Sequence, residues 1–470
     1  LIESHRIDLP GVAIHPEYQR HYPLGNYAAH VIGYVGEISE SQLKDPDFLD
    51  VQAGRIIGKF GVEKTLDTHL LGETGRKVVE VDAFGYPKRS LSIHPPLAGD
   101  DLYLTLDIRL QRLAEDLLGE EAGAIVALDP WNGDVLALAS QPGFNPNDLS
   151  GGISTESWQQ LLQDPRHPLT NRAIQGQYPP GSTFKIVMAA ALLDTQKMRA
   201  SDALPCPGTF PFGKRVFRDW KRGGHGSVAL SKAIEQSCDV YFYKIGNQLG
   251  IDSIATYSRQ FGLGAKTGIA LSSERSGLVP SKKWKRKNRG EPWYPGETIS
   301  IAIGQGFLSV TPIQMAKMVS IVATDGQVVQ PRLLKSIRLR RTGNLKEEPP
   351  SSTHQLAIGT DTFSKIKEGL TAVVTRGTAK RAQSDIVSIA GKTGTAQVVA
   401  LKDDNDKSEV AKKHRDHAWF VAFAPIEKPK IAVAVIVEHM GHGGSAAAPL
   451  AKTIIEAYIN SEKPEDIGSL

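Results

Sequence analysis

Apolar runs of strand length stand near both ends of the region from residue 105 to residue 470, and a largely helical stretch separates them. The runs 124–128 and 135–139 flank a short turn and predict a hairpin. The runs 418–424 and 431–438 lie near the other end, again with a turn between them. We expect all four to pair in one antiparallel sheet with helices on both sides, which gives an α/β (α+β) fold.

The chain is long enough for more than one domain, because 470 residues exceed the usual size of a single folding unit. Residues 1–104 contain short alternating segments, such as 78–81, between glycine and proline turns. This pattern predicts a β-rich N-terminal module, and it contains no grouping of acids and bases for chemistry. An amphipathic helix expected over 107–118 marks the change of pattern. We therefore predict two domains, residues 1–104 and 105–470.

The composition is that of a globular protein, with 40% apolar and 23% charged residues. The net charge of +4 is small for this length, and no basic stripe indicates a nucleic acid partner. One dense basic segment, residues 282–287, is either a solvated loop or a contact for an anionic glycan or a membrane surface. No run approaches the roughly 20 apolar residues of a membrane span. Because the chain begins without methionine, we expect it to be the soluble part of something longer.

Three short polar motifs carry the chemistry of the second region. The first, Ser-Thr-Phe-Lys at 182–185, follows a Pro-Pro-Gly turn and precedes the apolar run 186–193. This context places Ser182 near the N-terminus of a buried helix, where backbone N–H groups favour a developing oxyanion. Lys185, one turn further on, places an amine on the same face as the serine hydroxyl. The alternative is that Ser182 only caps the helix.

The second and third motifs are Ser-Cys-Asp at 237–239 and Lys-Thr-Gly at 392–394. Each motif alone is common, but the three in this order are the set found in serine enzymes that open an amide through an acyl-serine. The sequence therefore predicts one acyl-transfer site assembled from three distant segments.

Further segments match a known pattern along nearly the whole chain. They are 20–25 (RHYPLG), 58–63 (GKFGVE), 105–107 (TLD), 178–185, 218–221 (RDWK), 304–306 (GQG), 392–397 and 415–417 (RDH). With these segments the chain resembles the class B penicillin-binding proteins, most closely their elongation-type group. The resemblance implies a penicillin-binding/β-lactamase-like transpeptidase domain behind an N-terminal β-rich pedestal.

The implied function is that of a peptidoglycan D,D-transpeptidase, which cross-links stem peptides during cell elongation and rod-shape maintenance and is a target of β-lactams. Ser182 would be acylated by the penultimate D-alanine, and the amine of a neighbouring strand would then take the acyl group. One alternative is a D,D-carboxypeptidase or β-lactamase-like hydrolase. The long N-terminal module and the lack of an evident deacylating glutamate argue against it. Another alternative is a non-catalytic β-lactam sensor or scaffold.

The resemblance assigns catalytic roles that the chemistry of the residues supports. Lys185 is the candidate base, because an amine desolvated beside other cations loses its proton more easily. Ser237 would relay a proton to the leaving amine. Asp239 stands where most of the family has asparagine, although the elongation-type group also has aspartate. Because a carboxylate only accepts hydrogen bonds, the role of Asp239 stays open.

The third motif would bind the carboxylate of the substrate. Lys392 offers charge, and the hydroxyls of Thr393 and Thr395 offer hydrogen-bond donors. Gly394 lets the backbone of a strand approach closely. The backbone N–H groups of Ser182 and Thr395 would form the oxyanion hole.

Four side chains form a candidate zinc site. Cys206, Asp219, His225 and Cys238 supply the right ligand types, although their spacings are irregular. Elongation-type relatives carry a zinc site with an Asp-Asp-His-Cys pattern here, and Cys206 falls where they have the first aspartate. The alternatives are a disulfide between the only two cysteines or two unpaired buried thiols.

The expected partners are peptidoglycan stem peptides, β-lactams and a membrane-embedded glycan polymerase of the RodA kind within the elongation complex. By the resemblance, the complete protein has a single N-terminal anchor in the inner membrane, absent from this sequence, and a periplasmic catalytic domain. The N-terminal module would contact the polymerase, or it would only set the height of the active site above the membrane.

Overall fold

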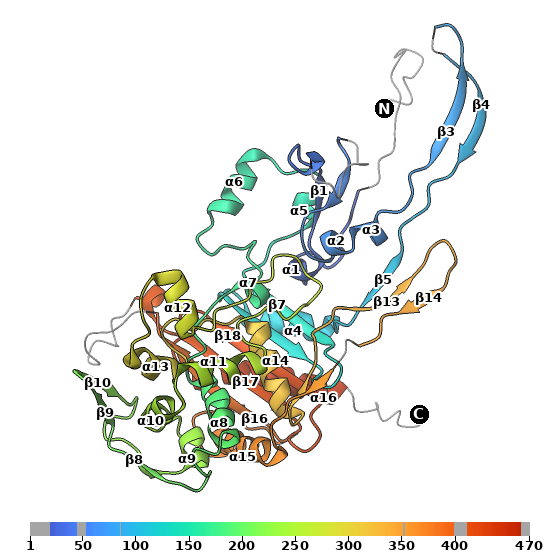
Figure 1. Ribbon diagram of the computed structural model, residues 1–470. Coiled ribbons are helices and arrows are strands. Elements are labelled where there is room, and N and C mark those ends of the chain that lie inside the picture. Colours follow the sequence, from blue (N-terminus) through green and yellow to red (C-terminus); the bar gives the residue numbers. More distant parts are fainter. Residues whose placement is uncertain (1–18, 45–52, 85, 351–352, 399–410, 462–470) are drawn as a thin grey trace, which may run out of the picture.

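The computed structural model describes residues 19–44, 53–84, 86–350, 353–398 and 411–461 (Figure 1). Among them, no helix combines the length and the apolar character that a membrane span requires.

Five antiparallel strands form the central sheet. In order across it they are β16 (Ala390–Ala396), β17 (His417–Ala424), β18 (Ile431–Val437), β6 (Gly123–Leu128) and β7 (Val135–Gln141). The expected hairpin is β6–β7, and β18 pairs with β6 along their length, as in Val435 opposite Ile125. Every residue of β6 and β18 is buried, which explains their unbroken apolar sequences. The prediction that one antiparallel sheet joins the two ends of this region is confirmed.

Helices cover both faces of this sheet, as the sequence predicted. On one face α14 (Pro312–Ala323) packs against β18, β6 and β17. On the other face α16 (Gly443–Ser461) packs against β17 and β18, beside α4 (Ile108–Leu118), which lies on β7 (Figure 1). The remaining helices of the region are α5 (Asn147–Ser150), α6 (Thr155–Gln163), α7 (Arg172–Gln175), α8 (Lys185–Asp194), α9 (Leu230–Glu235), α10 (Asp239–Leu249), α11 (Ile251–Gln260), α12 (Lys282–Arg289), α13 (Pro295–Ile301) and α15 (Thr360–Thr375).

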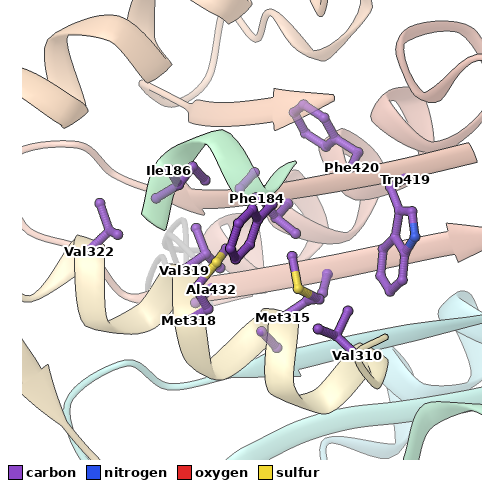
Figure 2. Close-up of a cluster of buried hydrophobic side chains, with 14 of the residues drawn as sticks. Phe184, Ile186, Val310, Met315, Met318, Val319, Val322, Trp419, Phe420 and Ala432 are labelled. Atoms are coloured by element: carbon purple, nitrogen blue, oxygen red, sulfur yellow. The ribbon is translucent and has the colours of Figure 1, made fainter. Parts of the chain in front are cut away.

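The hydrophobic core fixes the segment that carries Ser182. Helix α8 is apolar on every side and packs against α10, α11 and α15. Figure 2 shows Phe184, from the motif itself, among side chains of α14 and of the central sheet, including Met315, Met318 and Phe420. Because Phe184 is fully buried, it anchors the turn on which Ser182 stands.

The N-terminal part has short elements and one long arm. Its elements are α1 (Ala29–Ile32), β1 (Val35–Glu37), β2 (Ile56–Gly58), α2 (Gly61–Thr65), α3 (Asp67–Leu70), β3 (Arg76–Val81) and β4 (Pro87–His94). The β3–β4 hairpin projects away from the rest of the molecule (Figure 1). This part is rich in strand, as expected.

Small sheets complete the fold. β5 (Asp101–Leu104) pairs with β13 (Leu334–Arg338), which also pairs with β14 (Leu345–Glu347). The strand at the predicted domain boundary therefore joins residues of the later region, and the boundary after residue 104 stays a prediction. The other pairs are β8 (Leu204–Cys206) with β11 (Gly226–Val228), β9 (Thr209–Phe212) with β10 (Arg215–Arg218), and β12 (Gln327–Val328) with β15 (His354–Gln355).

Candidate active site

Ser182 lies in a single 3-10 turn, Gly181–Phe184, that leads into α8. Gly181 has a φ of 55°, and a side chain there would collide with the carbonyl oxygen of Thr395. A glycine is therefore required next to Ser182. The expected helix N-terminus is present, with the difference that it begins as a 3-10 turn.

Two other segments close around this turn. Gly304 lies against the backbone of Gly181, where a side chain would not fit. Gln305 donates from Nε2 to the carbonyl oxygen of Thr395 at 3.1 Å. Gly394 packs on the turn, since a Cβ there would lie 2.8 Å from the carbonyl oxygen of Pro180. The first and third motifs are thus in contact, with the segment 304–305 beside them.

Lys185 joins the first motif to the second. Its side chain is fully buried, and Nζ donates to the Ser237 carbonyl oxygen at 2.8 Å and to Ser237 Oγ at 3.2 Å. It also forms an ion pair with Asp239 Oδ1 at 2.6 Å. An ammonium has three protons, so these contacts account for all of them. The sequence left the role of Asp239 open, and in the structure this residue is the ion-pair partner of Lys185.

The second motif is a tight turn at the start of α10. Ser237 has a φ of 54°, a left-handed conformation that costs a residue with a side chain about 1–3 kcal/mol. Cys238 caps α10, its Sγ accepting from the Tyr241 N–H at 3.4 Å. The side chains of Ser237 and Asp239 point toward Lys185. The side chain of Cys238 points to the opposite side of the turn, toward Asp219. The expected opposition of these side chains is present, but it comes from a turn and not from an extended strand.

The third motif lies on the edge strand β16. Lys392 is fully buried and donates from Nζ to the carbonyl oxygen of Thr393 at 3.1 Å. Burial lowers the pKa of Lys392 well below its usual value, and the charge of Lys185 lowers it further, although Asp239 opposes both. An arriving carboxylate would offset this loss of hydration and favour the protonated form.

A loop that sequence reasoning missed supports the third motif. Thr378 Oγ1 lies 2.8 Å from Thr393 Oγ1, and either hydroxyl can donate. Two residues earlier, Arg376 Nε donates to the buried Glu235 Oε2 at 2.9 Å, at the end of α9. The loop therefore ties β16 to the segment just before Ser237. No local pattern indicates this contact, because its partners are far apart in sequence.

Another missed network holds the loop before Ser182. Tyr178 donates from its hydroxyl to Glu438 Oε1 at 2.7 Å, and Arg172 Nε donates to the same oxygen at 2.8 Å. Trp419 donates from Nε1 to the carbonyl oxygen of Pro179 at 3.1 Å. The only sequence signal for this network is that Glu438, a charged residue, directly follows an apolar run of strand length.

The four candidate metal ligands meet behind the second motif. Their donor atoms all lie within 4.8 Å of one another. Asp219 Oδ2 accepts from both Cys206 Sγ and Cys238 Sγ at 3.4 Å, and His225 Nδ1 lies 3.5 Å from Cys206 Sγ and from Asp219 Oδ1. In a tetrahedral zinc site with bonds of roughly 2.0–2.3 Å, ligand atoms lie about 3.3–3.8 Å apart. The residues therefore fit zinc.

The electrostatics of this cluster also suit a cation. Burial raises the pKa of the Cys238 thiol, and a hydrogen bond with Cys206 raises it further. Burial alone would raise the pKa of Asp219, but the Val240 and Lys221 N–H groups hold it below its usual value. Both cysteines are free and buried. Two thiols around a carboxylate become strong ligands only if a cation stabilises their thiolates.

Models of two protein families match the chain. The Penicillin-binding Protein dimerisation domain matches residues 1–104, and the Penicillin binding protein transpeptidase domain matches residues 123–456. The chain belongs to the penicillin-binding proteins. Among curated members of this family, the peptidoglycan D,D-transpeptidase MrdA of Acinetobacter baumannii is 43% identical over 97% of this chain and 68% of its own length. The Escherichia coli K12 protein of the same name is 39% identical over 97% of this chain and 74% of its own.

Solved structures of penicillin-binding protein 2 share the fold. The Helicobacter pylori protein, in a complex with MreC, has a TM-score of 0.85 at 35% identity, covering 98% of this chain and 82% of that one. The Pseudomonas aeruginosa protein, in a complex with WCK 5153, has a TM-score of 0.80 at 37% identity, covering 96% and 94%. This penicillin-binding protein is therefore a class B peptidoglycan D,D-transpeptidase of the type 2 group, an acyl-serine enzyme. Nothing in these similarities favours the hydrolase or sensor alternatives.

Proposed function

We propose that Ser182 is the nucleophile of this transpeptidase, with Lys185 as its base. The observation that supports this most is the buried cluster of Lys185, Ser237 and Asp239, which joins two motifs one helical turn from Ser182. Asp239 orients Lys185 by accepting a hydrogen bond from its Nζ. To act as a base, the ammonium first loses a proton to water, and the neutral amine then turns its lone pair toward the serine hydroxyl.

The reaction then follows in two acyl transfers. Ser182 Oγ attacks the carbonyl carbon of the penultimate D-alanine and gives its proton to Lys185. The backbone N–H groups of Ser182 and Thr395 stabilise the oxyanion. When the amide bond breaks, Ser237 passes its hydroxyl proton to the leaving D-alanine amine and regains one from Lys185. The amine of an acceptor stem peptide next attacks the ester carbonyl carbon and loses a proton to Lys185. As the ester bond to Ser182 breaks, that proton passes to Ser182 Oγ and restores the free serine.

Lys392, Thr393 and Thr395 form the proposed subsite for the terminal carboxylate. Lys392 supplies the charge, and the two hydroxyls supply donors. Because β-lactams present a carboxylate and a strained amide together, we propose that they acylate Ser182 in the same pose.

Mass spectrometry after penicillin treatment tests this assignment. We expect a single adduct on Ser182, none in Ser182→Ala, and an unchanged adduct in the exposed control Ser276→Ala. An adduct on any other residue overturns the assignment.

We also propose that Cys206, Asp219, His225 and Cys238 hold one structural Zn²⁺. When bound, the ion supplies a fixed cross-link between the β8–β11 segment and the start of α10 and takes no part in acyl transfer. Cys238 stands between Ser237 and Asp239, so the cross-link would set the position of both. Elemental analysis of protein purified without chelator should find one zinc per chain. A disulfide between the two cysteines, with no zinc, contradicts this proposal.

We further propose that the protein works in the elongation complex, anchored in the inner membrane with its catalytic region in the periplasm. Support comes from the related complex with MreC and from a related peptidoglycan synthase complex that coordinates polymerisation and cross-linking. The N-terminal arm offers exposed aromatic side chains, Phe84 at 86% and Tyr86 at 70% exposure, for a RodA-type polymerase. Phe84→Asp should alter glycan polymerisation in a reconstituted pair. Unchanged polymerisation in this variant and in others along the arm favours a passive spacer.

A further inference from the structure

Helix α12 concentrates positive charge on one short surface element. Its eight residues, Lys282–Arg289, contain six lysines and arginines and no acid. Since the whole chain has a net charge of +4, the rest of it has a net charge of −2. The excess positive charge of the protein is therefore local.

The inward side of α12 is firmly attached to the body. Lys285 is buried and forms ion pairs with Glu297 Oε1 at 2.5 Å and Glu291 Oε2 at 3.4 Å. Its Nζ also lies 4.2 Å from the centre of the Tyr294 ring. Trp284 packs on Phe307, with ring centres 5.4 Å apart. Two acids beside the helix, Glu291 and Glu297, are thus paired with Lys285.

The outward side is left with uncompensated cations. Lys283, Arg286 and Lys287 are exposed, and none forms an ion pair with the parts of the chain that the structure describes. Lys282 pairs with Asp252 at 3.0 Å, both half exposed or more. Like charges three or four residues apart repel one another along a helix, so this arrangement opposes helix stability. A sequence that accepts such repulsion is expected where the charges serve binding.

This surface adjoins the candidate active site. Phe307, on which Trp284 packs, follows the segment 304–306 directly. That segment touches the turn of Ser182 through Gly304 and holds Thr395 through Gln305. A substrate polymer that enters the site from this side would meet α12.

We propose that the outward face of α12, Lys283, Arg286 and Lys287, binds carboxylates on the stem peptides of a peptidoglycan strand. The activity requires a polymer whose stem peptides end in carboxylates, and arginine and lysine are the complementary groups. A membrane surface fits less well, because a helix that lies on a membrane needs an apolar face turned outward. The only apolar residue of α12, Trp284, is turned inward onto Phe307. The proposal rests on Ser182 being the place to which the strand is delivered.

A neutralised variant, Lys283→Gln with Arg286→Gln and Lys287→Gln, tests it. We expect binding to insoluble purified peptidoglycan to weaken roughly 3- to 100-fold in low salt. The difference from wild type should vanish at about 1 M salt, where the screening length is about 3 Å. When the carboxylates of the peptidoglycan have been amidated, the wild type should bind it no more tightly than the variant does.

The matched control changes three exposed lysines elsewhere: Lys214→Gln, Lys335→Gln and Lys428→Gln. It should bind peptidoglycan as the wild type does. Acylation by a small fluorescent penicillin should be unchanged in both triple variants, which separates this surface from the Ser182 assignment. Wild-type peptidoglycan binding in the α12 variant overturns the proposal. If the α12 variant loses binding to vesicles of anionic phospholipid but keeps binding to peptidoglycan, the proposal is overturned in favour of a membrane contact.

Discussion

Replacing Asp239 by asparagine separates the shape of this side chain from its charge. In the structure Oδ1 accepts from Lys185 Nζ at 2.6 Å, and Oδ2 accepts from the backbone N–H of Trp220 at 3.2 Å. An asparagine keeps one acceptor oxygen and places an NH₂ group where the other stood. Because Lys185 is fully buried, the oxygen should stay with it, and the Trp220 N–H should lose its partner.

The magnitude follows from that orphaned group. A buried donor left without an acceptor costs about 1–3 kcal/mol, and the Trp220 N–H is only partly buried, so we expect the lower half of this range. The melting temperature should fall by about 2–4 °C for each kcal/mol, or less in a chain of this length. Acylation should stay within about tenfold of wild type, equivalent to about 1.4 kcal/mol, because Lys185 keeps its neighbour.

Thermal melting and the acylation rate with a fluorescent penicillin measure the two effects separately. Asp385→Asn, at an exposed carboxylate, serves as the matched control and should change neither. If the Asp239→Asn protein has the melting temperature of the wild type, the reasoning that Asp239 needs both oxygens, one for Lys185 and one for the Trp220 N–H, is wrong. If its acylation disappears, the site needs the charge of Asp239 as well as an acceptor.

Three further predictions follow from buried groups. Lys185→Ala should lower the acylation rate about 100- to 10,000-fold while circular dichroism shows a folded protein, and an unchanged rate would place the base elsewhere. Cys238→Ser should lower both the melting temperature and the acylation rate by weakening the proposed zinc site, and a chelator should mimic it in the wild type only. Glu115, whose Oε1 accepts from the Ala28 N–H at 2.9 Å and from Gln111 Nε2 at 2.7 Å, has its pKa raised by burial to about 7. The pKa of Glu115 is higher in the folded protein than in the unfolded chain. Its contribution to stability is therefore complete below the unfolded pKa and is lost as the pH rises through the folded pKa of about 7. Glu115→Gln should therefore raise the melting temperature at pH 8 by the equivalent of up to about 3 kcal/mol and change it little at pH 4; an equal effect at both would contradict this.

Features encoded by local pattern could be predicted from the sequence. The apolar runs of β6, β7, β17 and β18 predicted the central sheet. Strands buried on both faces are apolar at nearly every position, and such runs are easy to recognise in a sequence. The motif residues Ser182, Lys185, Ser237 and Lys392 lie in neighbouring segments, as their order suggested.

Features that depend on long-range contact could not be predicted. Thr378 meets Thr393, and Glu438 meets Tyr178 across 260 residues, without any local signal. The left-handed backbone of Ser237 is equally hidden, since serine has no preference for it and only the surrounding fold imposes it. The partner of Lys185 needed the structure as well, because Asp239 could only be placed once the turn of the second motif was known.

The central sheet also sets the order in which a newly made chain can fold. The β6–β7 hairpin is complete at residue 141, whereas β18, which covers the other edge of β6, begins at residue 431. During the roughly 290 residues of synthesis between them, at about 5–20 residues per second, an apolar strand edge stays unpaired for about 15–60 seconds. Such an edge is a template for aggregation. Chaperone protection should therefore matter most in this interval, and no partly made chain can acylate, because β16 joins the sheet only through β17 and β18.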